Sequence, residues 1–173
     1  NLSVITARNP ADLNRDPRFL FLFNNELKPQ ISTLDEADFS ECNIVFFATP
    51  HGVCMRHAKV ILAKGIKVID MSTDFRLTDP EIFEKWYAIE HSAPDLLQEA
   101  VYGLPELNRN QIKQANLIAM PGCYPTSIIL GILPLLEEKF SLKTLIADSK
   151  SGVSGAGRSP NLSTAYGEVS ENF

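Results

Sequence analysis

Short apolar runs alternate with amphipathic segments through the middle of the chain. Residues 43–48 (NIVFFA) are almost continuously apolar and rich in β-branched and aromatic types, which is typical of a strand buried on both faces. Between residues 53 and 64 the apolar positions recur every three or four residues, which predicts an amphipathic helix. Lys64-Gly65 is typical of a helix C-terminus, and residues 66–71 start another strand. This strand–helix–strand unit indicates a parallel sheet with a right-handed crossover.

The flanking segments carry weaker patterns of the same kind. We predict strands at 2–7, 116–120 and 142–147, a helix at 78–87 that starts at a capping Thr or Asp and a proline, an apolar helix at 125–136, and a loop at 101–108 (VYGLPELN). The pattern of residues 10–40 leaves their strand or helix identity open.

Composition narrows the class of protein. The 173 residues are 45% hydrophobic and carry a net charge of −5 without a basic run, so we expect a folded chain that does not bind nucleic acid. Its apolar stretches are far shorter than the roughly 20 residues that span a membrane. Three cysteines without a CxxC pair and without a signal peptide fit a reducing cytoplasm. The start without Met suggests an excerpt of a longer protein.

Cys123 is the strongest candidate for chemistry. It lies in MPGCYPTS (120–127), where a predicted strand turns into a helix. A thiol at a helix N-terminus faces unpaired N–H groups and the positive end of the helix dipole, which favour the thiolate, and the same donors could hold an oxyanion. The alternative is a small buried apolar residue, as most lone cysteines are, and we assign that role to Cys42 and Cys54.

Other candidates follow predicted strands. The glycine- and serine-rich segment 149–158 (SKSGVSGAGR) could hold an anion or a dinucleotide, or be a surface loop. In an open α/β sheet, ligands bind at the carboxyl ends of the strands, where TPHG (49–52) and STDFR (72–76) both fall.

Individual side chains there have two interpretations each. His51 is a ligand contact or a structural histidine, and Arg76 is a fork for carboxylate or phosphate or the partner of Asp74 in a surface salt bridge. Arg8, after the first strand, would suit a 2′-phosphate or be a solvated arginine. The three histidines lack the spacing of a zinc site, so no metal is expected. A GxGxxG turn is absent, as expected if the chain begins at the second strand of a dinucleotide fold.

Five segments together resemble the N-acetyl-gamma-glutamyl-phosphate reductase family. They are TPHGV (49–53), IDMSTDFRL (69–77), VYGLPELNR (101–109), MPGCYPTS (120–127) and KSGVSGAGR (150–158). The resemblance implies an α/β fold: a Rossmann-type NADP-binding domain over residues 1–119, lacking its first strand and glycine-rich turn, and the start of an α+β catalytic and dimerisation domain over 120–173.

The resemblance also implies a reaction. The Cys123 thiolate attacks the acyl phosphate of N-acetyl-glutamyl 5-phosphate, and NADPH reduces the resulting thioester to the semialdehyde, a step of arginine biosynthesis. The family's acid/base histidine matches none of the histidines here, so the general base is unassigned. The implied cofactor residues are Arg8, Thr49, Pro50, His51, Gly52, Ser151, Gly152 and Gly155. Arg76 and Tyr124 are predicted substrate contacts, and a homodimer or homotetramer is expected.

Three alternatives stay open. The same cysteine would serve a reductase of aspartyl phosphate or of aminoadipyl phosphate. A thiol hydrolase could use it without a nicotinamide cofactor. A cofactor-binding module without catalytic activity would keep the sheet and lose the thiol reactivity.

Overall fold

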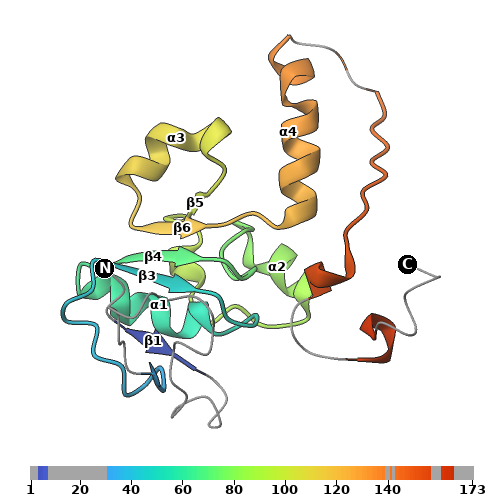
Figure 1. Cartoon of the computed structure of the whole chain (residues 1–173). Helices are drawn as coiled ribbons and strands as arrows, with labels where there is room; N and C mark the ends of the chain where they lie inside the picture. The colour runs from blue at the N-terminus through green and yellow to red at the C-terminus, as the bar shows by residue number, and fades with distance from the viewer. Residues whose placement is uncertain (1–3, 8–30, 139–140, 142, 157–160, 166–173) are drawn as a thin grey trace, which may run out of the picture. The chain divides into compact units, whose positions relative to one another are not determined.

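The computed structural model describes residues 4–7, 31–138, 141, 143–156 and 161–165 (Figure 1). The chain divides into two compact units, residues 1–121 and residues 122–173.

A four-stranded parallel sheet is the centre of the first unit. Its strands lie in the order β3 (Ile44–Phe47), β4 (Lys67–Asp70), β6 (Leu117–Ala119) and β5 (Val101–Tyr102). All three pairings are parallel. The α/β fold with a parallel sheet that the sequence predicts is therefore confirmed.

A second, two-stranded sheet belongs to the same unit. β1 (Ile5–Thr6) pairs in parallel with β2 (Ile31–Ser32). β1 lies inside the strand predicted at 2–7. β2 lies in the segment whose identity the sequence left open, where a two-residue strand is too short for an alternating pattern to reveal it.

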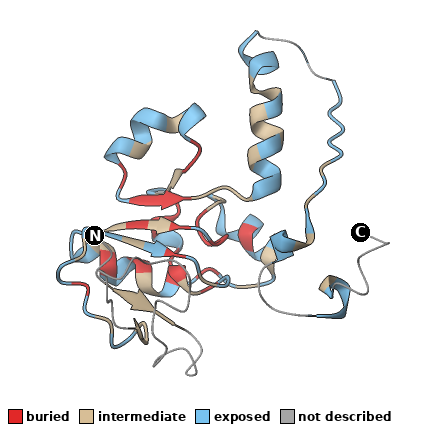
Figure 2. Ribbon diagram, in the orientation of Figure 1, coloured by how far each residue is buried: buried red, intermediate tan, exposed pale blue. Residues whose placement is uncertain are grey.

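Helices connect the strands of the larger sheet. They are α1 (Cys54–Ala63), α2 (Pro80–Tyr87), the 3₁₀ turn η3 (Pro94–Leu96) and α3 (Pro105–Gln114). α1 buries Cys54, Ala58 and Ile61, which belong to the predicted three- and four-residue repeat, together with Met55. Buried residues of α1 and of the central strands form the core, as the red segments of Figure 2 show.

Two expectations about the first unit were wrong. β3 is not buried on both faces: Ile44 is 45% exposed and Phe46 is 63% exposed, and both side chains lie on the same face, which is open in the described residues. Residues 101–108 are not a loop, since they contain β5 and the first turn of α3. Pro105 occupies the start of that helix, where its missing N–H costs no hydrogen bond, so the proline is a start signal here.

The second unit contains one long helix and two short turns. α4 spans Cys123–Glu137, so it begins two residues before the predicted start at Pro125, and η4 (Val153–Ala156) and η5 (Leu162–Thr164) follow. The predicted strand at 142–147 was wrong for its described residues, 143–147, which pair with no strand. A strand needs a neighbour for its backbone, and here Ile146 is left 88% exposed. No helix in the described segments is long and apolar enough to cross a membrane.

Candidate functional site

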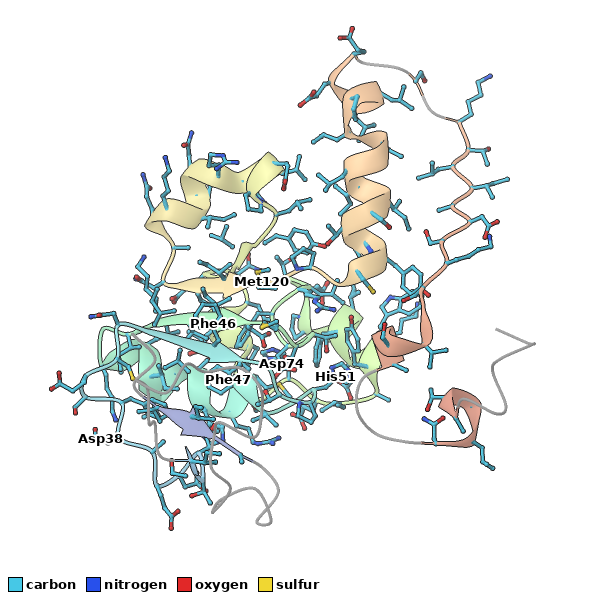
Figure 3. The ribbon with its side chains drawn as sticks, viewed as in Figure 1. Asp38, Phe46, Phe47, His51, Asp74 and Met120 are labelled. Atoms are coloured by element: carbon cyan, nitrogen blue, oxygen red, sulfur yellow. The ribbon has the colours of Figure 1, made fainter. Side chains whose placement is uncertain are left out.

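The carboxyl ends of three neighbouring strands form one edge of the larger sheet. The backbone ladder continues past the strands, because Met71 N–H donates to Phe47 O at 2.9 Å and Met120 N–H donates to Asp70 O at 2.7 Å. The predicted segments 49–52 and 72–76 both follow at this edge. Figure 3 shows His51, Asp74 and Met120 in this region.

Asp74 holds the turn that precedes α1. Its side chain is fully buried, with Oδ1 accepting from Gly52 N–H at 2.8 Å and Oδ2 from Met55 N–H at 3.0 Å. Gly52 has φ +81°, a left-handed conformation that favours glycine. Val53, at the N-cap of α1, has no side-chain acceptor for the free N–H groups, so the carboxylate replaces the missing cap.

Sequence analysis missed this role of Asp74. The sequence offered Asp74 only as the partner of Arg76 in one of two alternatives, whereas both of its carboxylate oxygens accept backbone amides. A usable signal existed: no Ser, Thr, Asp or Asn lies at the cap position of α1, so its amides need an acceptor from elsewhere in the fold.

Arg76 is held by backbone carbonyls of two strand ends. Its Nε donates to Met120 O at 2.7 Å, and its Nη2 donates to Met71 O at 3.1 Å. The half-buried guanidinium therefore joins the end of β4 to the end of β6. The surface salt bridge with Asp74 that the sequence offered as an alternative does not form in the described residues, because the Asp74 oxygens serve α1.

His51 and Thr49 mark the end of β3. Nδ1 of His51 lies 2.7 Å from Oγ1 of Thr73, and the imidazole ring is tilted over Tyr87 with ring centroids 5.7 Å apart. Oγ1 of Thr49 is buried and has no hydrogen-bond partner in the described residues. An unpaired buried hydroxyl is costly unless a ligand or a water satisfies it, so Thr49 is a candidate contact for a bound group.

A buried Asp–Cys pair lies behind this edge. Asp70 is fully buried; Oδ1 accepts from Ser72 N–H at 2.9 Å, while Oδ2 has no partner among the described groups. Burial raises the pKa of Asp70, and the hydrogen bonds from Ser72 oppose that rise. Burial, with the charges of Asp70 and Asp74, also strongly raises the pKa of the Cys54 thiol. The core role predicted for Cys54 is confirmed, whereas Cys42 is only half-buried.

Cys123 is exposed at the first position of α4. Gly122 precedes it at the N-cap without a side-chain cap, and the Gly122 carbonyl accepts from Thr126 N–H at 3.0 Å and from Thr126 Oγ1 at 2.8 Å. Pro125 has no N–H, so the backbone donors at this helix end belong to residues 122–124. The thiol thus lies beside a small set of backbone donors.

The glycine- and serine-rich segment forms a compact turn in the second unit. Gly155 N–H in η4 donates to the carbonyl of Gly152, the residue just before η4, at 2.9 Å. A Cβ at residue 155 would lie 2.6 Å from Oγ of Ser151, so a larger residue there would force the Ser151 hydroxyl to rotate away. Arg8, the residue predicted to bind a 2′-phosphate, lies outside the described residues.

The predicted site residues thus fall into three groups. Residues 49–52 and Arg76 share the sheet edge of the first unit; Cys123 and Tyr124 begin α4; and Ser151, Gly152 and Gly155 form the separate turn around η4. Across the residues that the structure describes, no three His, Cys, Asp or Glu side chains come together as a metal site would need.

Comparison with known proteins identifies two family domains in the chain. Residues 7–115 match the model described as "Semialdehyde dehydrogenase, NAD binding domain", and residues 123–173 match "Semialdehyde dehydrogenase, dimerisation domain". The first match supports a nicotinamide cofactor, and the second supports assembly into oligomers.

Curated relatives carry the name N-acetyl-gamma-glutamyl-phosphate reductase, which confirms the resemblance. The protein from Nitrosomonas europaea is 51% identical over 173 residues, covering 99% of this chain and 50% of the relative. The protein from Acinetobacter baumannii strain AYE is 55% identical over 147 residues, covering 83% of this chain and 42% of the relative. The chain therefore spans about half the length of these relatives.

Solved structures agree on the fold. The crystal structure of aspartate semialdehyde dehydrogenase II from Vibrio cholerae superposes with a TM-score of 0.56 at 17% sequence identity, covering 78% of this chain and 34% of that chain. The same enzyme complexed with ASA gives the same TM-score at 16% identity.

Proposed function

Because the chain belongs to the semialdehyde dehydrogenase family, we propose that the longer protein containing it reduces N-acetyl-glutamyl 5-phosphate to N-acetyl-glutamate 5-semialdehyde with NADPH. The relatives' shared name and five segments of sequence support this substrate. The observation that carries the chemistry is the exposed thiol of Cys123 at the first position of α4.

The proposed reaction starts at Cys123 Sγ. The thiolate attacks the carbonyl carbon of the acyl phosphate, the bond to the phosphate oxygen breaks, and phosphate leaves, so that an acyl thioester remains on the enzyme. Backbone N–H groups of residues 122–124 would stabilise the oxyanion formed during the attack. A bound reduced nicotinamide supplies the hydride that such an acyl group needs to become an aldehyde.

Residues 49–52 are proposed to contact the nicotinamide end of the cofactor. The buried Oγ1 of Thr49, which lacks a partner in the described residues, offers a hydrogen bond there. The N-terminus of α1 would ordinarily attract a phosphate, but the Asp74 carboxylate already accepts its amides. The Asp74 carboxylate therefore disfavours a negatively charged phosphate at this turn. The turn suits the nicotinamide end of the cofactor better than its diphosphate.

Arg76 and Tyr124 are proposed to contact the substrate. The two carbonyl acceptors of Arg76 use Nε and Nη2, so the guanidinium keeps further N–H donors in a fixed orientation. Such a fork suits the phosphate or carboxylate of an acyl phosphate substrate. Tyr124 is exposed next to Cys123 in α4.

The remaining expectations belong to the same proposal. Residues 1–119 would bind the cofactor, with Arg8 on the 2′-phosphate of NADP and Ser151, Gly152 and Gly155 contacting the cofactor from η4. Residues 120–173 would begin the catalytic and dimerisation domain of a homodimer or homotetramer in the cytoplasm. The preference of Arg8 is testable with Arg8→Ala, which should raise the KM for NADP more than the KM for NAD.

The direct test runs the reaction in reverse on the longer protein. N-acetyl-glutamate semialdehyde, NADP and phosphate are mixed, and NADPH is followed by its absorbance. We expect phosphate-dependent NADPH formation that Cys123→Ser abolishes and that the control Cys42→Ser keeps. A thiol hydrolase would form no NADPH, and turnover of aspartate semialdehyde or an aminoadipyl analogue in place of this aldehyde would keep the mechanism and overturn the substrate.

A further inference from the structure

The side chain of His51 is tied to the neighbouring strand end through one of its two ring nitrogens. His51 follows β3, and its Nδ1 lies 2.7 Å from Oγ1 of Thr73, which follows β4. Thr73 is buried, whereas His51 is exposed. No described residue hydrogen-bonds to the other ring nitrogen, Nε2. The imidazole thus has one anchored nitrogen and one nitrogen open to a ligand.

The direction of this hydrogen bond follows from the buried hydroxyl. A threonine hydroxyl carries one hydrogen, and among the described residues Nδ1 of His51 is the only acceptor bonded to Thr73 Oγ1. If Nδ1 carried the proton instead, the hydroxyl hydrogen would be buried without an acceptor, which is costly. The hydroxyl therefore donates to Nδ1, so the proton of the neutral imidazole lies on Nε2.

An aromatic contact fixes the plane of the same imidazole. The ring of His51 is tilted over Tyr87 of α2, with ring centroids 5.7 Å apart, and Tyr87 in turn contacts Phe83 at 4.9 Å. Phe83 is fully buried, so this contact is anchored in the core. Because a hydrogen bond and a stacked ring hold the imidazole together, its Nε2–H group is a donor with a fixed orientation.

The buried histidine of the same unit has no such open donor. Nδ1 of His91 accepts from Ala93 N–H at 3.2 Å, and its Nε2 bonds to the carbonyl of Asp74 at 2.8 Å. Both nitrogens of His91 are therefore used within the fold, which makes His91 a structural residue. His51 differs because one of its nitrogens has no partner in the described part of the chain.

We propose that Thr73 is a positioning residue that holds His51 in its Nε2–H form, so that Nε2–H donates to the carboxamide oxygen of the bound nicotinamide. The inference rests on the proposed function, in which residues 49–52 contact that end of the cofactor. A carboxamide oxygen is an uncharged acceptor, which suits a turn whose amides already bind the Asp74 carboxylate. Thr73 acts only through His51, because its hydroxyl hydrogen is used by Nδ1.

The first test reads the tautomer directly in the longer protein by NMR. Its histidines are labelled with nitrogen-15, and the ring signals of His51 are identified by their loss in His51→Ala. We expect Nδ1 of the wild type to resonate as an unprotonated nitrogen and Nε2 as a protonated one. Thr73→Val should shift the Nδ1 signal, whereas Thr73→Ser, which keeps a hydroxyl, should leave it near its wild-type position. Adding NADP should shift the Nε2 signal of the wild type.

The second test measures the Kd for NADPH from the fluorescence of the cofactor. Thr73→Val should raise this Kd about three- to tenfold, which corresponds to the loss of one neutral hydrogen bond, and Thr73→Ser should restore most of the affinity. Thr78→Val is the matched control, because the exposed Thr78 side chain makes no hydrogen bond within the described segments. Its Kd should equal that of the wild type.

The two tests separate failure of this proposal from failure of the proposed function. A proton on Nδ1 of the wild type, or equal Kd values for Thr73→Val and Thr73→Ser, would overturn the positioning role of Thr73. Equal weakening by Thr73→Val and Thr78→Val would overturn it as well. Binding of NADP that leaves the Nε2 signal unchanged would overturn the contact of His51 with the carboxamide and keep the proposed function. A wild type that binds neither NADP nor NADPH would overturn the proposed function and this proposal with it.

Discussion

Asp74→Asn should destabilise the first unit although it changes a single atom. The two carboxylate oxygens of Asp74 each accept a different amide, from Gly52 and from Met55, in a fully buried position. An asparagine keeps one acceptor and turns an N–H₂ group towards the other amide, so one buried N–H loses its partner and the remaining bond loses its charge. A hydrogen bond to a charged group contributes about 1.5–3 kcal/mol, and an unpaired buried donor costs about 1–3 kcal/mol. We therefore expect a loss of about 2–4 kcal/mol in the free energy of unfolding.

The assay is urea unfolding followed by circular dichroism at 222 nm, with Asp79→Asn as the matched control. Asp79 caps α2 at an exposed position and accepts both Glu81 N–H and Ile82 N–H with the same oxygen, Oδ1. Asparagine can keep both bonds there, and it caps helices about as well as aspartate, so the change should stay within about 0.5 kcal/mol. Equal effects of the two substitutions would refute the argument that Asp74 is a buried cap with two separate acceptors.

Three further changes have clear expected outcomes. Burial raises the pKa of Asp70, so the folded state favours its protonated form. The contribution of Asp70 to stability is therefore full below the unfolded-state pKa near 4 and is lost as pH rises through the folded pKa. In urea titrations, Asp70→Asn should be more stable than the wild type at pH 7, and the difference should shrink towards pH 4. Gly103→Ala places a Cβ 2.8 Å from a side-chain atom of β6 and should cost about 1–3 kcal/mol, whereas Gly131→Ala meets open space inside α4 and should raise helix content on thermal melting. Iodoacetamide should alkylate Cys123 in the native protein and Cys54 only after denaturation, measured by mass spectrometry of the peptides. Alkylation of both thiols at the same rate would contradict the burial of Cys54.

The elements that the sequence predicted correctly are those with a strong local period. The amphipathic stripe of α1 and the apolar run of β4 lie inside long, regular patterns, so periodicity locates both. β5 and β2 have two residues each, and a two-residue strand exists only because a neighbouring strand pairs with it. Such strands depend on tertiary pairing, and β2 and β5 do not lie in a longer apolar run like the one at 2–7 that located the two-residue β1.

The same reason explains the failure at residues 142–147. Their apolar, β-branched composition favours a strand, but strand formation requires a partner edge, and none lies beside 143–147 in the described residues. Conversely, β3 was predicted as fully buried because its composition is that of a central strand. Ile44 and Phe46 instead share one face of β3 that is exposed in the described residues, and whether a face is covered depends on other parts of the fold.

Arg76 shows why the sequence located the site more easily than it assigned roles within it. Parallel strands bring residues 49–52 and 72–76 to one edge, so their positions follow from strand order. Roles depend on hydrogen bonds between distant residues, and the bond from Arg76 Nε to Met120 O spans 44 positions of the chain. A lysine at this position would keep the positive charge and lose the planar pair of donors. Arg76→Lys in the longer protein should therefore keep part of the substrate affinity, while Arg76→Ala should lose the charge as well and raise the KM for the acyl phosphate further. Equal KM values for the two variants would mean that the guanidinium acts only through the strand ends that it joins, and that the substrate contact proposed for it is wrong.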